Sequence, residues 1–502
     1  MSLTAENILL VGSILLFISI FVSKAGAKIG VPALLLFLGV GMLGGTDGFG
    51  IHFNNPGLTQ FIGLMALSII LFSGGMDTRF SEIKPIMSEG VVLATAGVLA
   101  TALITGVFIH YLSNAIGGFI SLGWIESFLL ASVMSSTDSA SVFSILRSKS
   151  MQLKHNVRPL LELESGSNDP MAYMLMIFFI SLLQASEASI AMSALNVVIQ
   201  LVVGFGGGIL LGNLTRFIIN HSKIGNEALY PVLLFALVFF IFTVTDLAHG
   251  NGYLAVYIAG LVVGNKPLLH KKNLMTFFDG FTWLWQLIMF LTLGLLVEPS
   301  QLFTIKVAGA GILIGLFMII VARPITVFLC LIPFRKLPFK TKLYVSWIGL
   351  RGAVPIIFAT YPLVAGVENA GLFFNLVFFI TILSLLTQGT TVTLMAKLLK
   401  IAEPEVQSSN MFGIELPEEI KSAMSEFEVV PSVLSKGDLL MDINLPDNTL
   451  VVMIKRDHRY FVPKGNTHLQ LGDKLVLISD NEAELYKAYS ELGVQNYSVR
   501  KN

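Results

Sequence analysis

Long apolar runs dominate the chain up to about residue 400. A bilayer core about 30 Å thick is crossed by about 20 apolar residues in helical conformation. By that criterion the pattern predicts about thirteen membrane-spanning helices. The predicted spans cover residues 7–24, 31–47, 59–76, 90–113, 125–146, 160–185, 191–220, 228–246, 251–266, 275–297, 304–333, 342–363 and 371–399.

The pattern changes after residue 400. Charged residues now alternate with short runs typical of β-strands: TLVVMIKR (449–456), RYFVP (459–463) and KLVLISD (474–480). The turn signals PDN, PKGN and LGD separate these runs, and residues 482–492 are predicted to form a terminal amphipathic helix. We therefore predict a membrane domain over 1–400, a linker over 401–416 and a small cytoplasmic α+β domain over 417–502.

The composition supports a polytopic membrane protein. Only 13% of the residues are charged and the mean hydropathy is +0.78, whereas soluble domains carry about 25% charged residues. Lys+Arg and Asp+Glu both number 32, so the charge balance gives no reason to expect a nucleic-acid partner. The single cysteine, Cys330, excludes an intramolecular disulfide and a cysteine-based metal cluster.

The charges in the loops predict the orientation. The loops 48–58, 114–124, 186–190, 247–250 and 364–370 contain no Lys or Arg, whereas the loops between them are basic. By the positive-inside rule the basic loops are cytoplasmic. We therefore expect an uncleaved first span, the N-terminus outside and the C-terminus in the cytoplasm.

Four ionisable side chains are predicted to lie deep within the membrane. Asp169 follows Arg158 by eleven residues, which places it about 16 Å from the cytoplasmic surface at 1.5 Å per residue. The same estimate gives about 18 Å for Arg323 and about 14 Å for Arg351, and Asp138 lies in the middle of its span. Charge at this depth is costly and usually marks an ion or proton pathway.

Structural roles are the alternative for some of these charges. Arg323 could equally serve as a tie between helices, and Glu164 has two candidate partners, Arg323 and Arg351. Asp138 and Asp169 have hydroxyl and amide neighbours, so together they predict an oxygen-rich site for a monovalent cation. Glu162 and Asp246 lie closer to the ends of their spans and are predicted to be near the surface.

The spacing within LESGSNDP (163–170) divides its polar residues between two faces. Residues four apart share one face of a helix, so Ser165 and Asp169 are predicted to face the ion site. Glu164 and Asn168 point about 100° away and are expected to face a neighbouring helix that carries an arginine. Pro170 lacks a backbone donor and is expected to loosen the turn around Asp169.

Two stretches predict interrupted helices. SSTDSAS (135–141) surrounds one acid with small residues, and GLRGAVP (349–355) places two glycines, an arginine and a proline within a span. Broken helices at the middle of the membrane, in corresponding places of two halves, indicate the binding site of a transporter built from inverted repeats.

These motifs resemble those of the monovalent cation:proton antiporter family, which includes the Na+/H+ exchangers. The resemblance is closest to the bacterial potassium/proton antiporters that carry a C-terminal RCK-type (TrkA-C) domain. It covers nearly the whole chain and includes FSGGMDTRF (72–80), SSTDSASVFSIL (135–146), LELESGSNDP (161–170), GYLAVYIAGLVVGN (252–265), FLTLGLLV (290–297), VARP (321–324), GLRGAVP (349–355) and, in the C-terminal domain, residues 437–446 and 469–475.

The resemblance implies roles for eight residues. Thr137, Asp138, Ser165 and Asp169 would bind the cation, and Asp169 would hold either cation or proton. The residues implied to organise the site are Glu164, Asn168, Arg323 and Arg351, with Glu164 bridged to Arg323 and Arg351 compensating the crossing of the broken helices. Ser139 stands where many relatives have proline, and the break is expected to survive this difference.

The resemblance also implies a fold and an activity. Two inverted repeats would form a mobile core and a dimerisation domain of a homodimer in the bacterial cytoplasmic membrane. The expected activity is electroneutral exchange of K+ for H+ by alternating access, regulated by the cytoplasmic domain; Na+/H+ antiport is the alternative. No cofactor is expected, although the C-terminal domain could bind a nucleotide such as cyclic di-AMP.

Two other classes are less consistent with the residues. A ligand-gated cation channel would need a selectivity filter, and no TVGYG-like loop occurs in the sequence. An intramembrane aspartyl protease would also use two buried acids, but here two arginines and oxygen-rich helix breaks accompany them. The chain is therefore not expected to be an enzyme.

Overall fold

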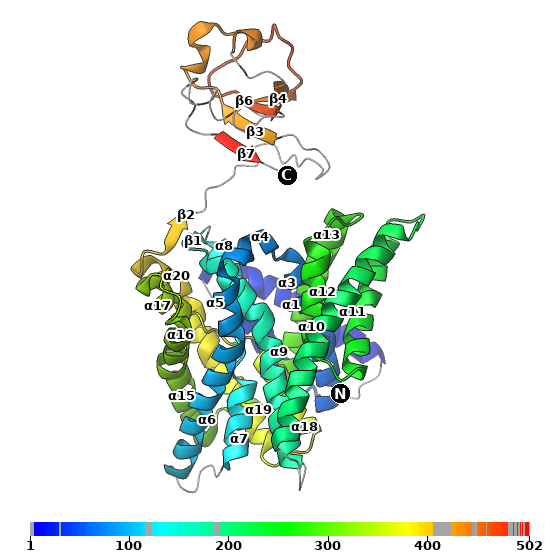
Figure 1. Cartoon of the computed structure of the whole chain (residues 1–502), viewed down its shortest axis with the longest axis vertical. Coiled ribbons are helices and arrows are strands. Elements are labelled where there is room, and N and C mark those ends of the chain that lie inside the picture. The colour runs from blue at the N-terminus through cyan, green and yellow to red at the C-terminus, as the bar shows by residue number, and fades with distance from the viewer. Residues whose placement is uncertain are drawn as a thin grey trace. The chain divides into compact units, whose positions relative to one another are not determined.

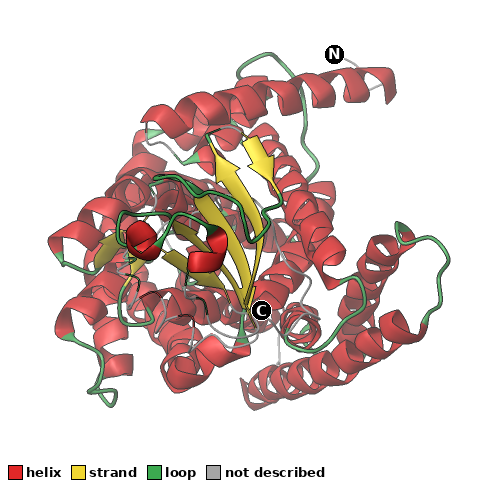
Figure 2. Ribbon diagram, turned by 90° about the horizontal axis from the view of Figure 1, so that it is seen from above, coloured by secondary structure: helices red, strands yellow, loops and turns green. Residues whose placement is uncertain are grey.

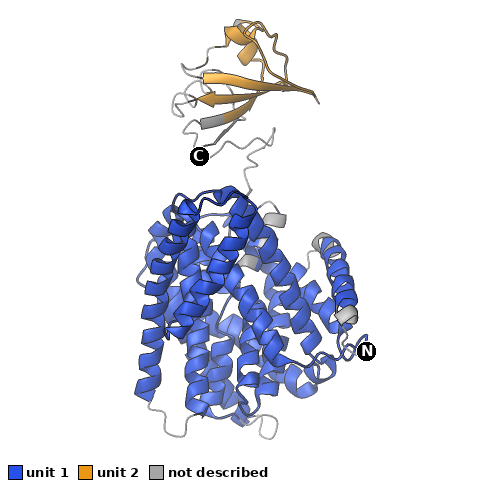
Figure 3. Ribbon diagram, turned by 90° about the vertical axis from the view of Figure 1, so that its right-hand side faces the viewer, with its two compact units in different colours: residues 1–404 blue, residues 405–502 orange. Residues whose placement is uncertain are grey.

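The computed structural model divides the chain into two compact units, residues 1–404 and residues 405–502 (Figure 3). In the first unit it describes residues 5–29, 32–115, 122–149, 151–184 and 190–404. In the second it describes residues 423–443, 445, 449–457, 459–479, 485, 489, 492, 494 and 497–500. Each unit is considered by itself below.

The first unit is built from apolar helices (Figures 1 and 2). Among the described residues, eight helical segments are long and apolar enough to cross a membrane, and five shorter apolar helices lie at the remaining predicted spans. The polytopic helical fold is thus confirmed, whereas the count of thirteen and the inverted repeat stay predictions. The helices are α1 (Ala5–Ile29), α2 (Ala33–Gly44), α3 (Pro56–Asp77), α4 (Phe80–Ile83), α5 (Met87–Val92), α6 (Val98–Ala115), α7 (Trp124–Val133), α8 (Ser139–Ser148), α9 (Val157–Gln184), α10 (Ile190–His221), α11 (Leu229–Leu247), α12 (Gly252–Gly264), α13 (Lys271–Leu296), α14 (Pro299–Leu302), α15 (Ile305–Phe317), α16 (Arg323–Leu331), α17 (Phe339–Trp347), α18 (Ala353–Val364), α19 (Ala370–Ser384) and α20 (Thr390–Leu398).

Both predicted helix breaks are present. The first break separates α7 from α8 over residues 134–138, and the second separates α17 from α18 over residues 348–352. The two breaks meet, because the backbone N–H of Asp138 donates to the carbonyl of Leu350 at 2.7 Å. The first break forms with Ser139 in the sequence, as predicted.

The proline in α9 does not interrupt its helix. The helix is continuous from Val157 to Gln184 with Pro170 inside it. Proline has no N–H, so the carbonyl of Gly166, one turn earlier, loses its usual helical donor. The side-chain amide of Asn251, the residue before α12, donates to the carbonyl of Pro170 itself at 3.0 Å and ties α9 to the start of α12.

Close glycine contacts interlock α12 with α3 and α10, and α13 with α2; α13 also packs against α3. A Cβ on Gly260 of α12 would lie 2.3 Å from the carbonyl oxygen of Phe72 in α3, and one on Gly294 of α13 would lie 2.4 Å from that of Leu38 in α2. On α10, a Cβ on Gly208 would lie 2.7 Å from the carbonyl oxygen of Ala255 in α12. Small residues let backbones approach closely, and this packing is a main source of stability between membrane helices. We refer to these five helices as the scaffold.

The first unit ends later than the sequence suggested. Strand β2 (Ala402–Pro404) pairs antiparallel with β1 (Met151–Leu153), and Ile401 is buried against the same helices. Residues 401–404, which we predicted to belong to the linker, therefore pack with the helical unit. The strands β1 and β2 lie with α4, α8 and α20 at the upper end of this unit in Figure 1.

The second unit contains a five-stranded antiparallel sheet in the order β5-β4-β6-β3-β7. Three of its strands were predicted: β4 (Thr449–Arg456), β5 (Arg459–Phe461) and β6 (Lys474–Ser479). Two were missed, β3 (Ala423–Glu428) and β7 (Tyr497–Arg500). One side of the sheet covers a core that includes Phe427, Ile454, Leu475 and Tyr489. Most of the predicted terminal helix, 482–492, falls outside the described residues.

Candidate functional site

The first break is shaped by its own polar side chains. Asp138 caps α8, because its Oδ1 accepts a hydrogen bond from the backbone N–H of Ser141 at 3.1 Å. The hydroxyl of Ser135 turns back to donate to the carbonyl of Ser132 at 2.7 Å. Short polar side chains compete in this way with the backbone bonds of a helix. The stretch SSTDS therefore leaves the helix and exposes backbone groups within the protein.

Helix α9 packs its polar turn against this break. The hydroxyl of Ser165 donates to the carbonyl of Thr137 at 3.0 Å and accepts from the backbone N–H of Ser139 at 3.1 Å. The hydroxyl of Ser136 donates to Oδ1 of Asp169. Ser165 and Asp169 thus face the first break together, as their spacing predicted.

Asn168 departs from the prediction. We expected it to face a helix carrying an arginine, but its side-chain amide donates to the hydroxyl of Thr137 at 2.6 Å and to the carbonyl of Thr137 at 3.2 Å. The prediction was wrong because a break in the neighbouring helix frees a carbonyl that no helical N–H can satisfy. The side chain of Asn168 turns toward that acceptor.

Glu164 and Arg323 form a buried ion pair. Oε1 of Glu164 lies 2.6 Å from Nη1 of Arg323, and their side chains are only 2% and 4% exposed. The second nitrogen of the guanidinium, Nη2, lies 3.4 Å from the carbonyl oxygen of Ile348, at the start of the second break. The contact between Glu164 and Arg323 is the one that the resemblance implied, rather than the alternative with Arg351.

Arg351 lies in the second break, and its side chain binds carbonyl groups of the first break. Its Nη1 donates to the carbonyls of Ser135 at 3.2 Å and Ser136 at 2.5 Å. Its backbone N–H donates to the hydroxyl of Ser384 on α19 at 3.0 Å. The carbonyl end of α7 carries a partial negative charge, so the guanidinium is placed where that charge requires balance.

The second break brings its backbone close to the acid of the first. A Cβ on Gly352 would lie 2.3 Å from Oδ2 of Asp138. Residue 352 must therefore be glycine if Asp138 is to keep its position. The arrangement gathers two carboxylates, several hydroxyls and freed carbonyls at one crossing, with a guanidinium supplied to each break.

Several contributing residues were not singled out in the sequence. Ser136 reaches Asp169 and Ser141 reaches Asp138, although both had been counted as part of a polar stretch. Ser384 and Gln388 were missed entirely: the hydroxyl of Ser384 donates to Oε1 of Gln388 at 2.6 Å, and Nε2 of Gln388 donates to the carbonyl of Trp347 at 2.7 Å. Nothing in the sequence near 384–388 distinguishes these residues from the polar side chains of other spans.

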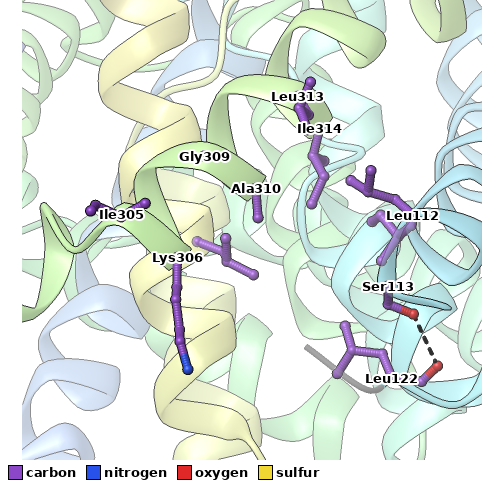
Figure 4. Close-up of a pocket in the computed structure, with 11 residues that line it drawn as sticks. Leu112, Ser113, Leu122, Ile305, Lys306, Gly309, Ala310, Leu313 and Ile314 are labelled. Atoms are coloured by element: carbon purple, nitrogen blue, oxygen red, sulfur yellow. Dashed lines mark hydrogen bonds between the residues drawn. The ribbon is translucent and has the colours of Figure 1, made fainter. Parts of the chain in front are cut away.

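A separate cavity of about 200 Å³ lies between α6, α15 and α19 (Figure 4). Its lining is almost entirely apolar and includes Leu112, Leu122 and Leu313, with Lys306 and Ser113 as its polar members. None of the eight predicted site residues lines it. The crossing of the two breaks, rather than this cavity, is therefore the candidate site.

Comparison with known proteins gives the family. The transmembrane region of the sodium/hydrogen exchangers matches residues 13–398. The chain belongs to the sodium/hydrogen exchanger family. It is accordingly a secondary transporter that exchanges a monovalent cation for protons. The TrkA-C domain matches residues 424–490 in the second unit.

Relatives in this exchanger family share most of the chain. The K(+)/H(+) antiporter NhaP2 of Shewanella sp. strain ANA-3 is 36% identical over 489 residues, covering 95% of this chain and 82% of that protein. The K(+)/H(+) antiporter NhaP of Alkalimonas amylolytica is 38% identical over 483 residues, covering 94% and 81%. The fold resembles the sodium proton antiporter MjNhaP1 of Methanocaldococcus jannaschii, with a TM-score of 0.65 at 24% identity, covering 77% of this chain and 99% of that one.

Proposed function

We propose that this exchanger carries K+ against H+ and that Asp169 is the carboxylate for which the two ions compete. The observation that carries the proposal is the position of Asp169, buried on α9 against the crossing of the two helix breaks. Oxygen atoms of Thr137 and Ser165 lie at the same crossing, and the carboxylate of Asp138 lies there against Gly352. Hard monovalent cations are bound by oxygen ligands of these kinds.

Competition for one carboxylate explains obligatory exchange. A protonated Asp169 lacks the charge that attracts a cation, and a cation bound to it excludes the proton. Asp138 adds a second carboxylate to the site, while Arg351 balances the carbonyl end of α7 and Arg323 is neutralised by Glu164. In this family an asparagine before the carboxylate is associated with electroneutral exchange, so Asn168 supports a ratio of one cation to one proton.

The names of the relatives favour K+ as the cation. Both relatives above 35% identity described here are K(+)/H(+) antiporters. Na+ is the second candidate, because a relative named Na(+)/H(+) antiporter 1 from Methanocaldococcus jannaschii is 27% identical over 364 residues. The polar groups at the crossing are compatible with either cation.

The test is exchange in proteoliposomes that contain a pH-sensitive dye and an imposed pH gradient. Addition of K+ should dissipate the gradient more effectively than Na+ or Li+, and Asp169→Asn should abolish this response. Glu368→Gln is the matched control, because Glu368 is an exposed acid in the loop between α18 and α19. Full exchange by Asp169→Asn would refute the assignment of the carboxylate, whereas a preference for Na+ would refute only the choice of cation.

The assembly and regulation are part of the same proposal. We infer a homodimer in the bacterial cytoplasmic membrane with the N-terminus outside and the C-terminus in the cytoplasm, where such exchange contributes to pH homeostasis. The TrkA-C domain would bind a small cytosolic ligand such as cyclic di-AMP. Adding this nucleotide to the cytoplasmic face of the proteoliposomes should change the exchange rate; an unchanged rate over a wide concentration range would exclude it as the ligand.

A further inference from the structure

Scaffold helix α12 presents two buried tyrosines to α9, at different levels along that helix. Tyr253 and Tyr257 are four residues apart, so they lie one turn apart on the same face of α12. The ring of Tyr253 contacts Tyr173, four residues after Asp169. The ring of Tyr257 lies on Gly166, three residues before Asp169. The two tyrosines therefore lie on opposite sides of Asp169 along α9.

The contact toward the C-terminal end of α9 is a cluster of three tyrosines. The hydroxyls of Tyr253 and Tyr361 are 3.0 Å apart, which joins the scaffold to the broken helix α18 by a hydrogen bond. The ring of Tyr173 packs edge-on against both, with centroids 5.1 Å from Tyr253 and 5.4 Å from Tyr361. Each tyrosine comes from a different helix, so the cluster closes the space between α9, α12 and α18.

The contact toward the N-terminal end of α9 has a different character. A Cβ on Gly166 would lie 2.3 Å from Cε2 of Tyr257, so the ring lies directly on the backbone of α9. The hydroxyl of Tyr257 is buried, with Ser167 of α9 and Thr78 as its polar neighbours. This contact is formed chiefly by one ring against one glycine, whereas the cluster around Tyr253 joins rings from three helices.

The packing between α12 and α9 also differs from the packing inside the scaffold. Backbone-to-backbone glycine contacts interlock α12 with α3 and α10. Against α9, by contrast, the contacts are made by the aromatic rings of α12 and by side-chain polar groups, such as the amide of Asn251, the residue before α12, on the carbonyl of Pro170. Flat rings and single hydrogen bonds can separate without unpacking a helix pair, whereas interlocked backbones cannot.

We propose that these tyrosines are the two barriers that control access to Asp169. Tyr253, with Tyr361 and Tyr173, blocks the route from the outside, and Tyr257 on Gly166 blocks the route from the cytoplasm. The two barriers open in alternation as α9 and α18 move against the scaffold. The inference rests on the proposed function, in which Asp169 is the site that must face each side in turn, and on the proposed orientation.

The experiment measures access to position 169 from each side of the membrane. Asp169→Cys provides the reporter, and Cys330→Ser removes the native thiol. A small, membrane-impermeant thiol reagent is applied to oriented vesicles from one side at a time, and the labelling rate is measured. Because the reporter variant does not need to transport, this measurement is independent of whether Asp169→Asn abolishes exchange.

The barriers predict opposite effects of two sets of variants. Tyr361→Phe, which removes one hydroxyl but keeps the ring, should raise the labelling rate from the outside several-fold without raising the rate from the cytoplasm. Tyr361→Ala should raise the outside rate further. Tyr257→Leu should raise only the rate from the cytoplasm, so each variant is the control for the other.

A third variant is the control for a general destabilisation of the structure. Tyr230→Phe removes a hydroxyl that donates to the carbonyl of Ser222 at 2.6 Å, away from α9, and should change neither rate. Equal changes from both sides, or no change for Tyr361→Phe and Tyr257→Leu in well-folded protein, would overturn the proposal. If Tyr361→Ala fails to fold, Tyr361→Phe decides the outer barrier by itself. If the two sets act from the sides opposite to those named, the barriers stand and the proposed orientation is wrong.

Discussion

At the scale of single residues, burial decides how much an ion pair contributes to the stability of the protein. Glu164 and Arg323 are almost fully buried together, whereas Arg158 and Glu162 form an ion pair on the same helix with side chains 56% and 24% exposed. Removing one partner of a buried pair leaves an uncompensated charge, while an exposed pair contributes little. The acids of the two pairs, Glu162 and Glu164, lie two residues apart on α9, so the stability effects of replacing them can be compared directly.

Glu164→Gln should destabilise the helical unit by about 3–5 kcal/mol, because Arg323 is then left buried without its counter-ion. Glu162→Gln should change the stability by no more than about 1 kcal/mol. Thermal unfolding of the detergent-solubilised protein, followed by the loss of a monodisperse peak, measures both. Equal stability of the two variants would contradict a structural role for Glu164.

The glycine at position 352 is predicted to be essential for a steric reason. In Gly352→Ala the new methyl group would meet Oδ2 of Asp138 and displace this carboxylate from the crossing. Misplacing a reacting group by about 1 Å can cost about 100-fold in rate, and we expect a loss of that order in cation-dependent proton flux. Gly371→Ala is the control, since its Cβ would meet nothing within 4 Å; it should exchange normally.

At the scale of elements, each helix break is completed by a side chain from another element. Arg351 of the second break binds carbonyls of the first, and Arg323 of α16 reaches the carbonyl of Ile348 in the second. The sequence predicted that helices would break at 135–141 and 349–355 because small polar residues, glycine and proline weaken a helix locally. It could not predict that the two breaks would join through Asp138 and Leu350, because that contact depends on how distant helices pack.

Arg351→Gln should therefore damage the crossing as well as the transport. The carbonyls of Ser135 and Ser136 would lose a charged donor, and each buried acceptor left without a partner costs about 1–3 kcal/mol. Arg351→Lys keeps the charge but not the planar guanidinium, so it should retain more stability than Arg351→Gln. Thermal unfolding and exchange, measured on the same preparations, test this order; a glutamine variant as stable as the lysine variant would contradict it.

At the scale of the whole molecule, all eight predicted site residues lie in the unit that ends at residue 404. The second unit has its own core and its own sheet. The last described contacts of the first unit are the short pairing of β2 with β1 and the buried side chain of Ile401. The stability of the helical unit should therefore depend on whether residues 399–404 are retained, and less on whether the second unit is present.

A chain shortened after residue 404 should fold and exchange cations for protons, without any response to a ligand of the TrkA-C domain. A chain shortened after residue 398 also loses Ile401, whose burial contributes about 1.5–3 kcal/mol, together with the pairing of β2. It should unfold at a lower temperature than the chain that ends at 404. Identical unfolding of the two chains would show that residues 399–404 do not stabilise the helical unit.

The sequence by itself determined the class of the protein, its polytopic helical fold, the two breaks and the acids and arginines placed at them. These follow from local properties: apolar length, the cost of charge in a membrane, and the weakness of helices rich in small polar residues. Tertiary structure decided which groups meet. Asn168 contacts Thr137, Glu164 pairs with Arg323, Gly352 lies against Asp138, and Ser384 accepts a hydrogen bond from the backbone of Arg351. Each contact joins segments that are separate in the sequence, and their distance in space depends on how the helices pack.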